Sequence, residues 1–379
     1  MGAVSMKTVA LRAGVSLNAV SLALRGDASI PVATRERIRA VADEIGYRRN
    51  PLVSALMADR GMKRDPRSSG LTLGYMTMNK TRDDWRDFAS PRRYFDGAAR
   101  RAAELGYQLE PFWLGDPDIA PRRMEVILRT RNVQGLLFAP APEMGLQIDI
   151  DCASYACVGL ETCVALPVIH RVMPDQRHAM VESLKQLRLH GYCRVGLTLR
   201  QYADERAALN WSSTFQAFHG HLGMGHWIPP LWLEDRDPGA EKNRLAFGDW
   251  IAANRPDVIL ALDPVVETWL RALGKRVPKD VGLAYLEVTE RTPGASGIER
   301  ESERVGAAAI DLLVTMLNHN QRGLPAFDNV LLIKGTWVEG STLKNAANPL
   351  KGHHRAWPLK AEEPGRGRGE DTSIYRFKL

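Results

Sequence analysis

The stretch MKTVALRAGVSLNAVSLALRG, residues 6–26, contains two short amphipathic patterns separated by a glycine. The apolar positions at helical spacing are filled by small residues: Val9, Ala10, Ala13, Val20 and Ala23. Gly14 can take the positive φ that ends a helix without a Cβ penalty. Ser16 is a suitable N-cap for the second helix. The pattern predicts two short helices packed closely around a glycine turn.

This arrangement is typical of a helix-turn-helix, whose second helix enters the major groove of DNA. An ordinary helical hairpin is the alternative, but it needs only the glycine turn and not small residues at all these positions. A third helix is predicted over about 32–45, directly after Pro31. Its inward stripe consists of Ile38, Val41, Ala42 and Ile45. The first 45 residues therefore indicate a small all-α head.

Positive charge is concentrated at the two ends of the chain. Residues 1–67 contain 12 Lys and Arg against 6 Asp and Glu, and residues 344–379 contain 8 against 4. Residues 68–343 contain 31 basic and 34 acidic side chains. A basic N-terminal module on a near-neutral body is typical of proteins that bind the phosphate backbone of nucleic acid.

From Leu71 onward, apolar runs alternate with helical periods. The expected elements in chain order are a strand at 71–76, a helix at 94–105, a strand at 107–114, a helix at 121–130, a strand at 134–140, a helix at 177–190, a strand at 194–199, a helix at 206–219, a strand at 257–262, a helix at 265–273, a strand at 281–288, a helix at 303–317 and a last stretch at 329–338. Such alternation predicts parallel sheets with helices on both faces. Two sets, the second starting near Val168, predict two doubly wound lobes with a ligand at the carboxyl ends of the strands.

Composition and motifs disfavour several classes of protein. No apolar run approaches the roughly 20 residues that span a bilayer, and the N-terminus lacks the pattern of an export signal. The four cysteines, which are Cys152, Cys157, Cys163 and Cys193, form no CxxC pair. A metal site of Cys152, Cys157 and His170 is conceivable, but its spacing differs from known zinc patterns. Catalytic and nucleotide-binding fingerprints are absent. We therefore expect a cytoplasmic protein that is not an enzyme and uses no cofactor, metal or membrane.

The chain resembles the LacI/GalR family of transcriptional regulators from residue 4 to about residue 343. The N-terminal landmarks are VALRAGVSLNAVSLALRG, TRERIRAVADEIGYRRN and NPLVSALM; those of the body are YFDGAARRAAELGYQLE, VQGLLFAPAP, LHGYCRVGLT, VPKDVGLAYLE and ERVGAAAIDLLVTML. The resemblance implies an N-terminal all-α helix-turn-helix head, joined by a hinge to an α/β two-lobed, doubly wound periplasmic-binding-protein-like core. It also implies a homodimer on a pseudo-palindromic double-stranded DNA operator, with a small-molecule effector such as a sugar between the lobes.

The domain boundaries expected on this basis divide the chain into a head, a linker, a core and a tail. The DNA-binding domain is expected at 4–58, with a hinge helix at about 50–58, and the linker at 59–70. The effector-binding and dimerisation core is expected at 71–343, with lobe 1 at about 71–165 and 293–322 and lobe 2 at about 166–290 and 325–343. Residues 344–379, rich in Gly, Pro and charge, are expected to form a disordered basic tail.

The resemblance also implies which residues face DNA. They lie in the helices of the head and in the hinge: Ser5, Met6, Ser16, Leu17, Asn18, Ser21, Leu22, Arg25, Thr34, Tyr47, Asn50 and Leu56. Asn18 can pair bidentately with adenine, and Leu17 or Leu22 can contact a thymine methyl group. Arg25 and the hydroxyl groups suit phosphates, and Leu56 suits a wedge in the minor groove. Packing is the alternative for the two leucines, but both fall opposite the inward stripe, which favours contact with DNA.

The chain departs from the family pattern at several positions. Leu22 stands where many members have arginine, so the operator is expected to differ from the common type. In the effector cleft, Trp211 replaces an arginine often used after GLTLR, whereas Asp263 and Glu287 match positions that are often acidic. The expected effector-lining residues are Tyr94, Trp211, Asp263 and Glu287, although Trp211 suits a core position equally well.

The sequence therefore predicts a sequence-specific DNA-binding transcriptional regulator, acting as a repressor and gated by a small molecule between the lobes. A purine or amino-acid effector is one alternative, which leaves the DNA-binding role unchanged. A solute-binding α/β protein with an incidental helical head is another, and the basic charge of residues 1–67 disfavours it.

Overall fold

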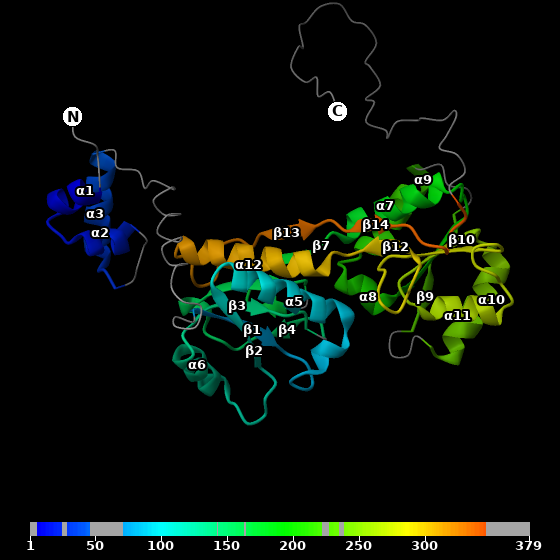
Figure 1. The fold of residues 1–379 in the computed structure, drawn as a ribbon, viewed down its shortest axis with the longest axis horizontal. Helices are drawn as coiled ribbons and strands as arrows, with labels where there is room; N and C mark the ends of the chain where they lie inside the picture. The colour runs from blue at the N-terminus through cyan, green and yellow to red at the C-terminus, as the bar shows by residue number, and fades with distance from the viewer. Residues whose placement is uncertain are drawn as a thin grey trace, which may run out of the picture.

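The computed structural model describes residues 6–24, 29–45, 71–141, 143–162, 164–221, 227–234 and 239–345. They form an N-terminal helical head and a core of two α/β lobes (Figure 1). The predicted hinge, the linker and the tail from residue 346 lie outside these ranges. Within the described ranges, no helix is both long and apolar enough to cross a membrane.

The head consists of α1 (Met6–Ala13), α2 (Leu17–Leu24) and α3 (Val32–Glu44). Its buried core contains only residues predicted to point inward: Val9, Ala10, Ala13, Val20, Ala23, Ile38 and Ala42. Gly14, with a φ of 63°, makes the turn between α1 and α2. The Ala19 amide donates to Ser16 Oγ at 3.1 Å, which is the predicted N-cap of α2. Small inward side chains thus allow three short helices to pack around one core.

The first lobe is built on a six-stranded parallel sheet in the order β13-β7-β5-β3-β1-β2. Its strands are β1 (Leu71–Thr77), β2 (Tyr107–Trp113), β3 (Val133–Phe138), β5 (Ala156–Leu160), β7 (His170–Pro174) and β13 (Val330–Ile333). Its helices are α5 (Ala89–Glu104), α6 (Pro121–Thr130) and α12 (Ser302–Asn318). Helices α5 and α12 pack on one face of the sheet and α6 on the other.

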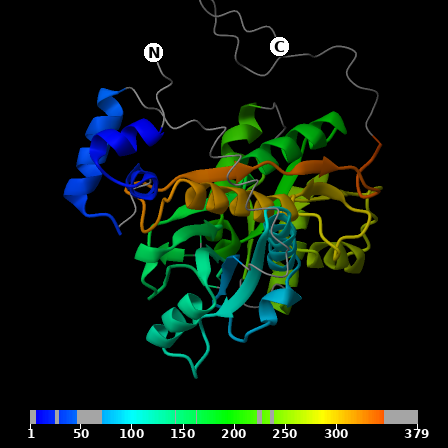
Figure 2. The same ribbon diagram turned by 60° about the vertical axis from the view of Figure 1, so that its left-hand side comes forward.

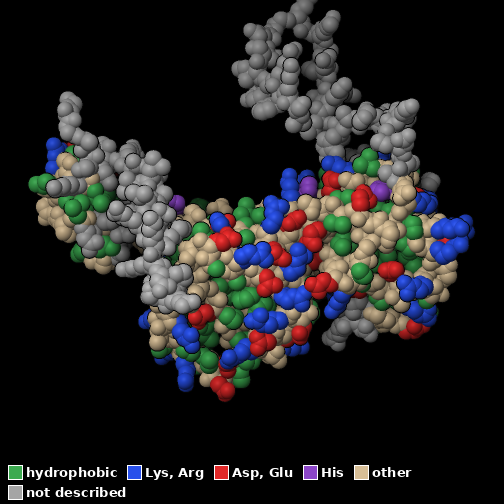
Figure 3. All heavy atoms as spheres, in the orientation of Figure 1, with side chains coloured by type: hydrophobic (Ala, Val, Ile, Leu, Met, Phe, Trp, Pro, Cys, Tyr) green, Lys and Arg blue, Asp and Glu red, His purple; other side chains and the backbone are tan. Residues whose placement is uncertain are grey.

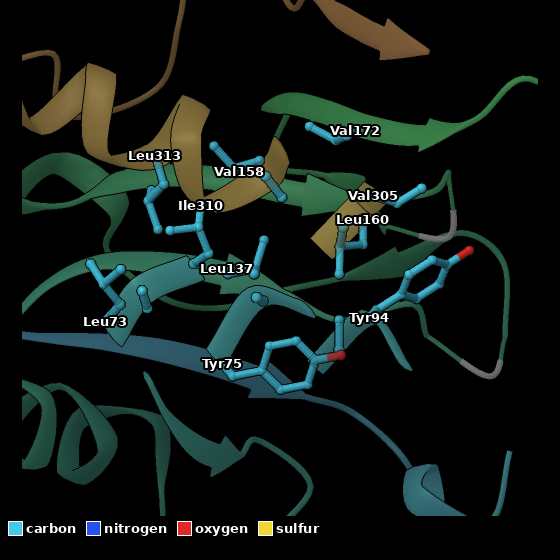
Figure 4. Packing of buried hydrophobic residues seen from close by; sticks show 14 of the residues in the cluster. Leu73, Tyr75, Tyr94, Leu137, Val158, Leu160, Val172, Val305, Ile310 and Leu313 are labelled. Atoms are coloured by element: carbon cyan, nitrogen blue, oxygen red, sulfur yellow. The ribbon is translucent and has the colours of Figure 1, made fainter. Parts of the chain in front are cut away.

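Side chains along the strands of this sheet alternate between the two faces, because successive residues of a strand point to opposite sides. Leu73, Tyr75 and Leu137 join the cluster under α5 and α12, which Figure 4 shows from close by. Met76 and Leu136 join the cluster under α6. The sheet is therefore buried on both faces, as is usual for parallel strands.

The second lobe has a six-stranded sheet in the order β14-β12-β11-β10-β8-β9, in which only β14 is antiparallel to its neighbour. Its strands are β8 (Val195–Arg200), β9 (Leu231–Leu233), β10 (Val258–Ala261), β11 (Gly282–Tyr285), β12 (Ser296–Glu299) and β14 (Thr336–Val338). Helices α7 (Gln176–Leu189) and α9 (Asn210–His221) pack on one face, and α10 (Glu241–Asn254) and α11 (Val265–Ala272) on the other. Two doubly wound lobes are therefore present, as predicted.

The boundaries between the lobes differ from those predicted. The chain passes from one lobe to the other between β7 and α7, between β12 and α12, and between β13 and β14. Figure 2 shows the segment from β13 to β14, in orange, running along both lobes. Each crossing comes one strand later than expected, because β7 and β13 belong to the first sheet and β12 to the second. The local sequence pattern of a short strand does not depend on the sheet that contains it, so only its pairing partners reveal the lobe.

Other differences concern individual elements. The helix expected at 206–219 is two helices, α8 (Gln201–Arg206) and α9, because Ala208 and Leu209 take left-handed backbone conformations between them. The stretch expected at 329–338 is split between β13 and β14, which lie in different sheets. Helix α10 and strands β5, β7, β9 and β12 were not predicted, nor was the small sheet of β4 (Leu146–Gln147) and β6 (Val164–Leu166).

Candidate nucleic-acid interface and interlobe cleft

Helix α2 has a buried side and an outer side. Val20 and Ala23 are completely buried in the head, whereas Leu17 is 46% exposed and Ser16 is exposed. Leu22 is half-buried. The leucine at the start of the helix therefore points away from the core, where it can reach a ligand as large as a DNA duplex.

The remaining residues predicted to face DNA are only partly described. Met6, on α1, is half-buried against the core of the head, and Thr34, on α3, is also half-buried. Asn18 and Ser21 lie on α2. Five of the predicted residues fall outside the described ranges: Ser5, Arg25, Tyr47, Asn50 and Leu56. Their assignment to DNA contact stays a prediction.

The predicted effector cleft lies at the carboxyl ends of the parallel strands of the core. Glu161 follows β5 of the first lobe, whereas Glu287 comes after β11 and Arg206 ends α8, both in the second lobe. Arg300 directly follows β12, where the chain crosses back to the first lobe. Carboxyl ends of parallel strands meet at one edge of each sheet, which is where ligands bind in open α/β folds.

These side chains form one network of ion pairs and hydrogen bonds between the lobes. Tyr94 Oη donates to Glu161 Oε1 at 2.7 Å. Arg300 donates to Glu161 at 3.0 Å and to Glu287 at 2.9 Å. Arg206 lies 3.3 Å from the other carboxylate oxygen of Glu161. The exposed fractions of the four charged side chains lie between 14% and 22%, so the network is largely shielded from water.

Burial and charge act in opposite directions on these groups. Burial raises the pKa of Glu161, but Arg300 and Arg206 more than offset this, so its pKa lies below the usual value. Burial lowers the pKa of Arg300, whereas its acidic neighbours, foremost Glu287, hold it well above the usual value. Burial is also the largest cause of the strongly raised pKa of Tyr94. These directions favour the charged forms of Glu161 and Arg300 at neutral pH, with Tyr94 as a neutral donor.

The structure separates the predicted effector residues. Tyr94 and Glu287 are brought together through Arg300, which donates to both. Asp263 is paired with Arg200, at 3.4 Å between Nε and Oδ2. Trp211 is 4% exposed and belongs to the core of the second lobe, so its expected place in the cleft is wrong. On α9 it packs against buried apolar side chains under the sheet. Burying a large aromatic ring among apolar side chains is more favourable than leaving it in an open cleft.

Sequence reasoning missed Glu161, Arg206 and Arg300. A signal was present for Glu161, which comes at the end of the short apolar run ACVGL, where a charged residue marks the exit of a buried strand. Arg300 follows SGIE, which is not an apolar run and gave no such signal. The strands CVGL and SGIE had not been recognised, and the charges that follow them were therefore not placed in the cleft.

The outer face of α5 and α12 is lined with alternating acidic and basic side chains (Figure 3). Arg93 lies 2.9 Å from Glu299, and Arg101 lies 2.7 Å from Asp311. These partly exposed pairs cancel one another locally, so this face lacks the unbalanced positive charge that phosphate binding requires.

Comparison with known proteins supports the interpretation of the head as a helix-turn-helix. Residues 5–50 match the family model described as bacterial regulatory proteins, lacI family. The maltose regulon regulatory protein MalI of Escherichia coli (strain K12) is 47% identical over 53 residues, which are 14% of this chain. The aligned segment spans only 16% of that relative's length.

Solved structures resemble the chain over most of its length. A lac repressor dimer bound to operator and the anti-inducer ONPF matches with a TM-score of 0.52 and 16% identity, covering 90% of this chain and 100% of that one. The transcriptional regulator CelR in complex with cellobiose matches with a TM-score of 0.51 and 18% identity over the same shares. A putative LacI-family regulator from Rhizobium etli matches with a TM-score of 0.57 and 15% identity, covering 72% of this chain and 99% of that one.

The chain shares the fold of these solved structures, which has a helical head and a two-lobed, periplasmic-binding-protein-like core. The predicted resemblance to the LacI/GalR family is confirmed for the head, because residues 5–50 match the lacI family model.

Proposed function

We propose that this protein is a sequence-specific DNA-binding transcriptional regulator, acting as a repressor whose affinity for its operator is set by a small molecule between the lobes. The observation that carries the proposal is the orientation of α2 within the segment that matches the lacI family model: Val20 and Ala23 are buried, and Leu17 is turned outward. In a helix-turn-helix, this is the helix that enters the major groove. The chain acts by binding, in the cytoplasm, and not by catalysis.

In this proposal residues 4–58 form the DNA-binding unit, with the hinge at about 50–58. The protein binds a pseudo-palindromic operator as a homodimer, since a two-fold operator matches a two-fold protein. The likeness to a lac repressor dimer bound to operator supports this assembly.

The proposed effector is a sugar. Support comes from the structural neighbour that binds cellobiose and from the name of the MalI relative, a maltose regulon regulatory protein. We expect Tyr94 and Glu287, which Arg300 links at the junction of the lobes, to contact such a ligand together with Asp263, which follows β10 at the carboxyl edge of the second sheet. Hydroxyl groups of a sugar pair well with carboxylates, guanidiniums and tyrosine.

The proposal is tested by DNA binding of the full chain over a series of salt concentrations, using DNA from its own gene neighbourhood. Affinity should fall steeply as salt rises, because a basic dimeric head releases counterions from several phosphates. Asn18→Ala should cost about 1–3 kcal/mol and relax the preference at one position of each half-site. Arg25→Ala should weaken binding to all sequences alike.

Two results would contradict this function. One is binding that does not change between low and physiological salt. The other is an Asn18→Ala protein that keeps the sequence preference of the wild type at every position of the site. Adding a panel of sugars to the same assay identifies the effector by the shift in affinity.

A further inference from the structure

The interlobe network includes several contacts that join the first lobe directly to the second. Arg206 donates to the Ala141 carbonyl at 2.7 Å, and its own carbonyl accepts from Thr162 Oγ1 at 2.7 Å. Ser90 Oγ donates to Glu287 Oε1. Arg206 and Glu287 belong to the second lobe, whereas their partners here belong to the first. The centre of the cleft is thus bridged by the protein's own side chains.

Further ion pairs lie at the rim of the same cleft. Arg92 lies 2.7 Å from Glu290, and Arg93 lies 2.9 Å from Glu299. Both arginines are on α5 of the first lobe, and both acids belong to the second lobe. These pairs are more exposed than the central ones, so each contributes little to holding the lobes together.

The charges at the centre of the cleft are balanced. Glu161 and Glu287 carry two negative charges, and Arg206 and Arg300 carry two positive ones. A buried cluster of zero net charge is stable only while every member keeps its partner, because a buried ion left alone costs far more than a paired one. Removal of one carboxylate would leave a guanidinium that regains hydration only when the lobes separate.

Glu161 is held in an unusual backbone conformation. Its φ is 59°, in the left-handed region that a residue with a side chain seldom adopts. Glu301, which follows Arg300 at the crossing between lobes, has a φ of 57°. Strain of this kind persists where surrounding contacts compensate for it, and it is frequent at switches. The Glu161 carboxylate contacts both Arg300 and Arg206 from this conformation.

We propose that Glu161, Arg206, Glu287 and Arg300 form a latch that keeps the two lobes closed in the absence of any small molecule. A ligand of the cleft then has to displace protein contacts and does not enter an open, empty site. This proposal concerns lobe closure alone and does not depend on DNA binding or on the identity of an effector.

The test is hydrogen exchange of the full-length, dialysed protein without added ligand, followed by mass spectrometry. Glu161→Gln keeps the size of the side chain but removes its charge. Amides in peptides covering 161–162, 201–207 and 287–301 should exchange about tenfold or more faster, because breaking a buried ion pair favours the open form. Amides of β3 and β10 should keep their protection, which shows that both lobes remain folded.

A compensating variant sharpens the test. Glu161→Gln combined with Arg206→Met removes one charge of each sign and restores the balance, so cleft amides should exchange more slowly than in Glu161→Gln alone. Asp311→Asn is the matched control, since it breaks the 2.7 Å pair with Arg101 within the first lobe and should leave the cleft unchanged. The latch is disproved if Glu161→Gln behaves like the Asp311→Asn control. It is equally disproved if the double variant exchanges faster at the cleft than Glu161→Gln alone.

Discussion

At the scale of single residues, Ser16 combines two roles at the start of α2. Its hydroxyl accepts the Ala19 amide at 3.1 Å, and it is exposed on the side predicted to face DNA. Ser16→Ala removes the cap, at a cost of about 1 kcal/mol, so amides of α2 should exchange about fivefold faster. Hydrogen exchange of the full chain measures this loss.

Ser16→Asp separates the two roles of this residue. Aspartate is as good an N-cap as serine and suits the positive end of the helix dipole, so the exchange rates should stay near those of the wild type. Its negative charge would face phosphates, and DNA binding should weaken in a binding assay at fixed salt. A Ser16→Asp protein that binds DNA like the wild type would show that Ser16 does not lie against the backbone of the duplex.

Single residues also show where sequence reasoning reached its limit in the cleft. Tyr94 and Glu287 were expected there and lie in one network, but the arginine that links them, Arg300, was not foreseen. Trp211 was assigned to the cleft from its place in the family pattern and lies in the core. The direction of a side chain on a helix depends on which neighbouring elements cover that helix, and the spacing of one segment does not reveal this.

At the scale of elements, α5 and α12 cross at two glycines. A Cβ added at Gly306 would lie 2.0 Å from the Tyr94 carbonyl oxygen, and one at Gly97 would lie 2.0 Å from the Glu303 carbonyl oxygen. Both contacts are to backbone, which cannot turn away as a side chain can. The close crossing brings α5, with Ser90 and its arginines, up to the edge of the cleft.

Gly306→Ala should destabilise the protein by about 1–3 kcal/mol through overpacking, although alanine is the better helix former. The matched control is Gly248→Ala in α10, where the nearest atom to a new Cβ would be 3.8 Å away. There the gain in helix propensity is unopposed, and stability should rise by about 0.5–1 kcal/mol. Denaturant unfolding of the two variants measures both the expected loss and the expected gain in the free energy of unfolding. A Gly306→Ala protein as stable as the wild type would mean that the helices can separate at little cost.

At the scale of the whole molecule, the head and the core have separate apolar cores. Among the described residues, the buried clusters of both lobes draw only on residues from 71 to 345, and that of the head only on residues up to 45. A chain of residues 71–345 should therefore fold by itself, with the circular dichroism of an α/β protein, and should not bind DNA. A chain of residues 1–345 is the control and should keep its sequence-specific binding.

The same pair of chains distinguishes the proposed regulator from a solute-binding protein with an incidental head. If the 71–345 chain still bound the operator, the head would not be the DNA-binding part of the molecule. If it failed to fold, the head would be needed for the stability of the core.

Local pattern was sufficient for the head and for most elements of the core. Each short helix of the head shows its inward stripe, its turn or its cap within a few residues, so Gly14, Ser16 and the buried alanines could be assigned without knowledge of the fold. The sheet to which a strand belongs could not be assigned in this way. Strands β7, β12 and β13 are short segments whose local pattern does not distinguish the two sheets, and hydrogen bonding to distant strands places them in one lobe or the other. The cleft network depends on the same long-range pairing, because Glu161, Arg206 and Arg300 come from segments that meet only after both sheets have formed.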